Sequence, residues 1–145
     1  MIGKSLGLWM ILLYGISLAG CSQERVAQAP APETVLQAIP AANLAQFERV
    51  HDMRTWRNPY LIVRPDGVAL LDAADSAEIR LKPAELLSAL AALPASNWPY
   101  GRVVAATENS AKSSEQDSVA IRRNKGIVGG ILQSAHIAIK WVPSA

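Results

Sequence analysis

Residues 60–71 read Tyr-Leu-Ile-Val-Arg-Pro-Asp-Gly-Val-Ala-Leu-Leu, which places two β-rich runs on either side of a short turn signal. In Pro65-Asp66-Gly67, proline fixes φ, aspartate bonds locally to the backbone, and glycine accepts a positive φ. Two β-rich runs that flank such a tripeptide predict a β-hairpin. A short third strand is expected at Glu78 to Leu81.

Helices and strands alternate after this hairpin. Pro83 opens a predicted helix that ends near Leu93, because proline is tolerated in a first turn and the leucines recur at helical spacing. Arg102 to Thr107 is a predicted strand, residues 119–134 a second helix, and His136 to Val142 a last strand with alternating side chains. The order ββ(β)-α-β-α-β predicts a small α+β domain, with two helices on one face of a mixed sheet.

The region before the hairpin divides at about residue 43. Residues 43–54 form either a short helix, with Asn43 as its N-cap and Leu44 and Phe47 on one side, or an extended segment. Residues 22–42 are rich in serine, glutamine, alanine and proline, which is typical of a tether. The predicted organisation is a leader over 1–20, a flexible tether over 21–42 and a single α+β domain over 43–145.

The leader has the features of a secretory signal. Lys4 supplies a positive charge, and the apolar run over residues 6–18 is shorter than the roughly 20 residues of a membrane-spanning helix. Cys21 follows the leader directly, and the sequence Leu18-Ala19-Gly20-Cys21 resembles the lipobox of bacterial lipoproteins. The alternative without lipid attachment is an ordinary signal peptide, or an uncleaved anchor, with an incidental cysteine.

The lipobox resemblance implies a membrane-anchored protein. It implies cleavage between Gly20 and Cys21, and lipid attachment to Cys21 as the first residue of the mature chain. Ser22 follows the cysteine, and a residue other than aspartate there favours the outer membrane, facing the periplasm, if the host is Gram-negative. The expected location is therefore the cell envelope, with the membrane as a partner through the lipid.

A second resemblance covers residues 59–143. Its order of parts is similar to the periplasmic domain of ExbD/TolR-type biopolymer-transport proteins. The matching segments are Leu61–Gly67, Val68–Leu71, Pro83–Leu93, Val103–Ala106, Ile127–Leu132 and Ile137–Val142. The resemblance implies the fold and a tendency to bind a peptide or protein partner. It implies no motor function, because a lipoprotein leader stands where that family has a spanning helix with a proton-handling aspartate.

Composition excludes several classes of protein. A chain of 145 residues, 50% apolar, has room for one domain and a tail. With 14 basic and 12 acidic side chains it lacks the basic balance of a nucleic-acid binder. One cysteine forms no internal disulfide and no cysteine-rich metal site. We therefore expect no nucleic-acid partner, no cofactor and no metal.

Catalytic signals are weak. His51-Asp52 could act as a base for Ser110 or Ser113, since triads assemble in space, but the chain has neither a G-x-S-x-G elbow nor an H-E-x-x-H motif. Solvated loop serines are the simpler interpretation, and no catalytic residue is predicted.

Two further groups of residues could be interpreted as ligand sites. Asp72, Asp75 and Glu78 fit no calcium loop, so a polar turn explains them better. The glycines at 126, 129 and 130 lack the pattern of a phosphate cradle, and a bend or close packing of the helix is the preferred interpretation.

Candidate binding residues fall into two groups. Segments 54–60 and 97–101 both precede strands, so they could lie at one end of the sheet, and aromatic side chains beside arginine are typical of binding hot spots. They are equally typical of lids on a small core. The members are Arg54, Trp56, Arg57, Tyr60, Trp98 and Tyr100.

The second group is the basic cluster Arg122, Arg123 and Lys125. It could contact anionic headgroups, glycan or peptide carboxylates, or form a solvated helix face. Basic residues in the first turn of a helix oppose its dipole, so either the helix begins after 119 or the cluster has another purpose.

The leading hypothesis is a non-enzymatic envelope lipoprotein that binds a protein or peptide, with pairing at an exposed sheet edge as the mode. The same pairing could form a homodimer. The alternatives are an envelope hydrolase or small-ligand-binding lipoprotein, and a structural subunit of an envelope complex.

Overall fold

A computed structural model describes residues 28–72, 76–110 and 113–144. The leader and the cysteine at 21 lie outside the described residues. The elements in chain order are α1 (Pro32–Gln37), α2 (Leu44–Phe47), β1 (Tyr60–Arg64), β2 (Gly67–Leu71), β3 (Glu78–Leu81), α3 (Leu86–Ala91), β4 (Val103–Glu108), α4 (Glu115–Ser134) and β5 (Ala138–Trp141).

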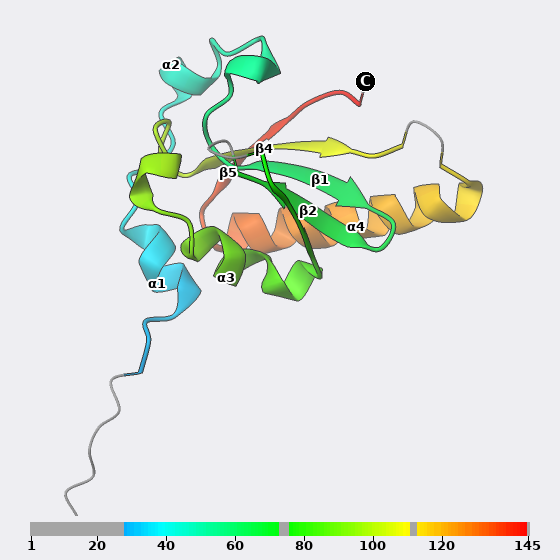
Figure 1. Ribbon diagram of the computed structural model, residues 1–145, viewed down its shortest axis with the longest axis horizontal. Helices are drawn as coiled ribbons and strands as arrows, with labels where there is room; N and C mark the ends of the chain where they lie inside the picture. The colour runs from blue at the N-terminus through cyan, green and yellow to red at the C-terminus, as the bar shows by residue number, and fades with distance from the viewer. Residues whose placement is uncertain (1–27, 73–75, 111–112, 145) are drawn as a thin grey trace, which may run out of the picture.

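The five strands form one mixed sheet in the order β3-β2-β1-β4-β5. β1 pairs antiparallel with β2 and parallel with β4, and β5 pairs parallel with β4. Both helical crossovers step in the same direction across the sheet, so the right-handed rule places α3 and α4 on one face. Figure 1 shows both helices there, which confirms the predicted α+β class and element order.

The predicted hairpin is present, and its turn depends on Gly67. This residue has φ +149°, and a Cβ there would lie 2.3 Å from the carbonyl oxygen of Leu81 on the neighbouring strand. The Nδ2 of Asn124 in α4 donates to the carbonyl oxygens of Arg64 at 2.8 Å and Pro65 at 3.1 Å. A buried amide therefore fastens the turn to the helix.

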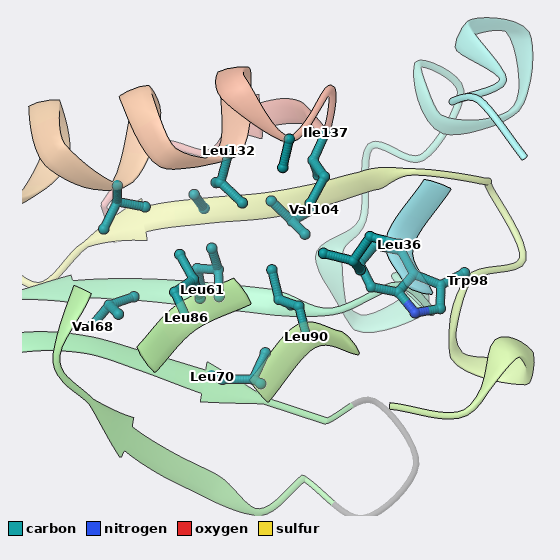
Figure 2. Close-up of a cluster of buried hydrophobic side chains, with 13 residues drawn as sticks. Leu36, Leu61, Val68, Leu70, Leu86, Leu90, Trp98, Val104, Leu132 and Ile137 are labelled. Carbon is teal, nitrogen blue, oxygen red and sulfur yellow. The ribbon is translucent and has the colours of Figure 1, made fainter. Parts of the chain in front are cut away.

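The main core lies between the sheet and the helices, and it includes a residue from the predicted tether. Leu36 in α1 is fully buried in this core and lies beside Trp98 (Figure 2). Gln37 also donates to the carbonyl oxygen of Ala135, at 3.0 Å. The predicted boundary at residue 43 is therefore wrong, because a short helix beginning at Pro32 completes the helical layer.

Two helix boundaries also differ from the prediction. α4 begins at Glu115, four residues before the predicted start at residue 119, because Ser114 and Asp117 form a reciprocal capping box. Arg122 and Arg123 therefore lie beyond the first turn, and the expected conflict with the helix dipole does not arise. The helix expected from Pro83 is a 3₁₀ turn followed by the short α3.

Residues 43–56 cover part of the opposite face of the sheet. They form α2, capped by Asn43, and a 3₁₀ turn at Met53–Thr55, so the helical alternative is met over the four residues of α2. Phe47 packs with Val103 in a second, smaller core, whereas Leu44 is 60% exposed and does not share its side. The Lys140 Nζ in β5 donates to the carbonyl oxygens of Phe47 and Val50, at 2.8 and 2.6 Å, and holds this segment down.

The three glycines of α4 are not packed against the sheet, contrary to expectation. A Cβ at position 126, 129 or 130 would have no heavy atom within 4 Å outside its own helical neighbours. Gly101 is the opposite case, with φ +76° and a Cβ position 2.3 Å from the carbonyl oxygen of Ala41.

These two environments predict opposite effects of the same substitution. Gly101→Ala is expected to lower the free energy of unfolding by about 2–3 kcal/mol, because it combines backbone strain with a main-chain clash. Gly126→Ala is expected to raise it by about 1 kcal/mol, because an exposed helical glycine costs about that much relative to alanine. Urea denaturation of both variants checks the signs, and a stabilised Gly101→Ala protein would contradict the described loop geometry.

Candidate functional site

The two aromatic segments meet at one end of the sheet, as predicted, and Asn58 joins them. The side chain of Asn58 is fully buried. Its Nδ2 donates to the carbonyl oxygens of Gly101 and Val103, both at 2.8 Å, and its Oδ1 accepts from the backbone N–H of Tyr100 at 3.0 Å. The role of Asn58 was not predictable from the sequence, because its partners lie more than 40 residues away in the chain.

The aromatic side chains of these segments serve two separate cores. Trp56 packs in the smaller core and Trp98 in the larger, and both are nearly buried. The rings of Trp56 and Tyr100 lie 5.1 Å apart between centroids, and Tyr60 is half-buried. Of this candidate group, only Arg54 and Arg57 are exposed. The geometry therefore favours the lid interpretation over a binding hot spot.

The two edges of the sheet differ in chemistry. At the β3 edge, Glu78 pairs with Arg64 at 2.5 Å and with Arg80 at 3.6 Å, and Arg80 also lies 3.9 Å from Asp66. Charged side chains on an edge strand discourage pairing with another chain. The β3 edge is therefore protected.

The β5 edge presents unused main-chain groups. The N–H groups of Ala138 and Val142 donate inward, to the carbonyl oxygens of Arg102 at 2.9 Å and Ala106 at 2.8 Å. Because successive residues of a strand point their main-chain groups to opposite edges, Ile139 and Trp141 direct theirs outward. No strand within the described ranges lies beyond β5.

The surface beside β5 combines apolar and polar side chains. A groove of about 610 Å³ runs between this strand and α4, lined by Gly129, Gln133, His136, Ile137, Ala138, Ile139 and Trp141. Trp141 is 40% exposed. Lys140 does not charge this edge, because its ammonium group is bound on the opposite face of the sheet.

The three basic residues of the cluster point to different sides of α4. Lys125 points toward β5, where its Nζ lies 2.5 Å from the Glu108 carboxylate and 4.5 Å from the ring centroid of Trp141. Arg122 and Arg123 are exposed on the outer side of α4. Within the basic cluster, Arg122 and Arg123 are therefore the two residues without a carboxylate partner among the described residues.

The catalytic candidates are not brought together by any contact. His51 and Asp52 are exposed, and the Asp52 carboxylate accepts from the backbone N–H of Arg54 at 2.9 Å. Ser110 bonds to Ser144, and Ser113 to a backbone carbonyl. Among the described residues, no hydrogen bond joins either histidine to a serine or a carboxylate.

The three acidic residues that the sequence offered as a cation site, and that we interpreted as a polar turn, are also divided. Asp72 accepts from Asn97 at 2.7 Å, Glu78 is paired with arginine, and Asp75 lies outside the described residues. In the described part of the chain, no three histidine, cysteine or acidic residues gather as a metal site would need.

Comparisons with protein-family models, with curated proteins and with solved structures find no match for this chain. Within the described ranges, no helix is both long and apolar enough to cross a membrane.

Proposed function

We propose that this protein is a lipid-anchored envelope lipoprotein whose folded domain is a non-enzymatic binding module for an extended protein segment. The anchor is inferred from Leu18-Ala19-Gly20-Cys21 and its apolar leader. The observation that carries the binding function is the β5 edge, with its outward main-chain groups and the groove that lies beside it.

The mode of binding is addition of a strand. A segment in the extended conformation would form main-chain hydrogen bonds with Ile139 and Trp141 and extend the sheet beyond β5. Alternate side chains of that segment would enter the groove between β5 and α4, because side chains of a strand point to alternate faces. An apolar side chain at those positions would contact Trp141 and occupy the open space beside Gly129.

Photo-crosslinking in intact cells tests this proposal. A photoreactive phenylalanine derivative at position 141 is expected to yield a discrete crosslinked product. The same group at Ile79, which is 45% exposed on the β3 edge, is the matched control and is expected to yield none. Equal crosslinking from both edges, or none from position 141, would contradict a binding role for β5.

The mass of the crosslinked product identifies the occupant. A product of twice the chain mass would indicate a homodimer formed through β5, and any other discrete mass would indicate a different protein. Both results preserve strand addition as the mode of binding.

A further inference from the structure

The outer side of α4 combines positive charge with exposed apolar side chains. Arg122 and Arg123 are exposed there, together with Val119 at 55% and Ile127 at 44% of their surface. Neither arginine forms an ion pair within the described ranges. From residue 118 to 134 the helix has three basic residues and no acidic one, and Lys125 is the only one of the three with a carboxylate partner.

Helices that lie on a membrane surface combine the same two kinds of side chain. Such helices have basic side chains that reach the headgroups and apolar side chains at the boundary with the acyl chains. The positive charge complements an anionic headgroup layer, since arginine near such a surface is attracted to it. The β3 edge, by contrast, mixes both signs of charge.

The position of the tether is consistent with this orientation. Cys21 and Pro32 are eleven positions apart, so a fully extended chain between them spans at most about 40 Å. α1 lies in the same layer as α3 and α4 (Figure 1), and Gln37 bonds to Ala135 just after the end of α4. Arg123 lies about 18 Å from that end along the helix axis. A lipid on Cys21 would therefore keep this layer within reach of the bilayer.

We propose that the outer side of α4, centred on Arg122, Arg123 and Ile127, docks on an anionic lipid bilayer. The proposal depends on the lipid anchor proposed above. Docking would fix the orientation of the domain, with the helical layer toward the membrane and the second face of the sheet away from it. Loss of each arginine is expected to lower the docking equilibrium about fivefold.

Depth-dependent quenching on full-length, lipidated protein tests this orientation. Cys21 is the only cysteine and would carry the lipid, so an introduced cysteine can be labelled selectively with a fluorophore. Ile127→Cys reports on α4, and Ile79→Cys is the control because the two isoleucines are almost equally exposed, at 44% and 45%. Vesicles contain spin-labelled lipid in phosphatidylcholine, either alone or with an equal part of phosphatidylglycerol.

The expected result is strong quenching at position 127 in vesicles with phosphatidylglycerol, and weak quenching at position 79. The double variant Arg122→Glu/Arg123→Glu should reduce quenching at 127 to the level at 79, while flotation with the vesicles is unchanged. Equal quenching at both positions in protein that floats would overturn docking by α4 and leave the anchor intact. Wild-type protein that neither carries lipid nor floats would overturn the anchor, and the docking proposal with it.

Discussion

Replacing Cys21 with serine is expected to abolish acyl labelling of the protein and its recovery with membranes. The resemblance to bacterial lipoproteins implies that the Cys21 thiol accepts the diacylglyceryl group. A serine hydroxyl does not substitute for this thiol. Each buried CH₂ contributes about 0.8 kcal/mol, so losing several acyl chains removes nearly all the membrane affinity. Metabolic labelling with a fatty acid, followed by flotation, measures both effects.

Ser22→Ala is the matched control for this variant. It changes the neighbouring residue and keeps the thiol, so labelling and flotation should match those of the wild-type protein. Acyl labelling that persists in Cys21→Ser would show that Cys21 is not the modified residue, and the anchor proposed here would then be wrong.

Replacing Asn58 with leucine is expected to lower the free energy of unfolding by about 3–5 kcal/mol. Three main-chain groups lose their partner at once, namely the carbonyl oxygens of Gly101 and Val103 and the N–H of Tyr100. A buried polar group without a partner costs about 1–3 kcal/mol, and leucine supplies no donor or acceptor. Urea denaturation followed by tryptophan fluorescence measures the change.

Asn109→Leu is the control for Asn58→Leu. Asn109 is exposed and follows β4, and its side chain forms no hydrogen bond with the described residues. Its replacement should change stability by less than about 0.5 kcal/mol. If Asn58→Leu has an equally small effect, then Asn58 does not join the two aromatic segments.

The sheet was predictable because its signals are local. The turn residues Pro65-Asp66-Gly67 and the β-rich runs beside them are contiguous in the chain, and β1 and β3 have the predicted bounds. The capping box at Ser114 was also a local signal, of the S-x-x-D type, and it would have placed the start of α4 correctly. The polar composition of the surrounding segment, by contrast, is typical of a loop.

The remaining features depend on contacts between distant parts of the chain. Leu36 lies in a segment with the composition of a tether, and only its burial against the helical layer makes α1 part of the fold. Trp56 and Trp98 occur in similar sequence contexts but enter different cores. Which residues on α4 face solvent follows from the direction of the helix across the sheet, so the exposure of Ile127 could not be predicted from its apolar character.

The sequence predicted pairing at an exposed sheet edge as a mode of binding, but it did not indicate which edge. The sequence does not distinguish β3 from β5 as the open edge, because both contain charged residues. The difference arises in three dimensions. Glu78 and Arg80 form an ion pair at the β3 edge, whereas the Lys140 ammonium group bonds to the carbonyl oxygen of Phe47 on the face of the sheet away from α4.

The most direct test of strand addition at β5 is the effect of Ile139→Pro on crosslinking from position 141. Proline at 139 removes an outward N–H and leaves the inward N–H groups at 138 and 142 bonded to the β4 side, so the fold should persist. The predicted result is loss of the crosslinked product from a protein that remains folded, with a thermal stability lowered by the loss of the Ile139 side chain from the main core. Undiminished crosslinking from a folded Ile139→Pro protein would contradict the proposal that this edge binds its partner by strand addition.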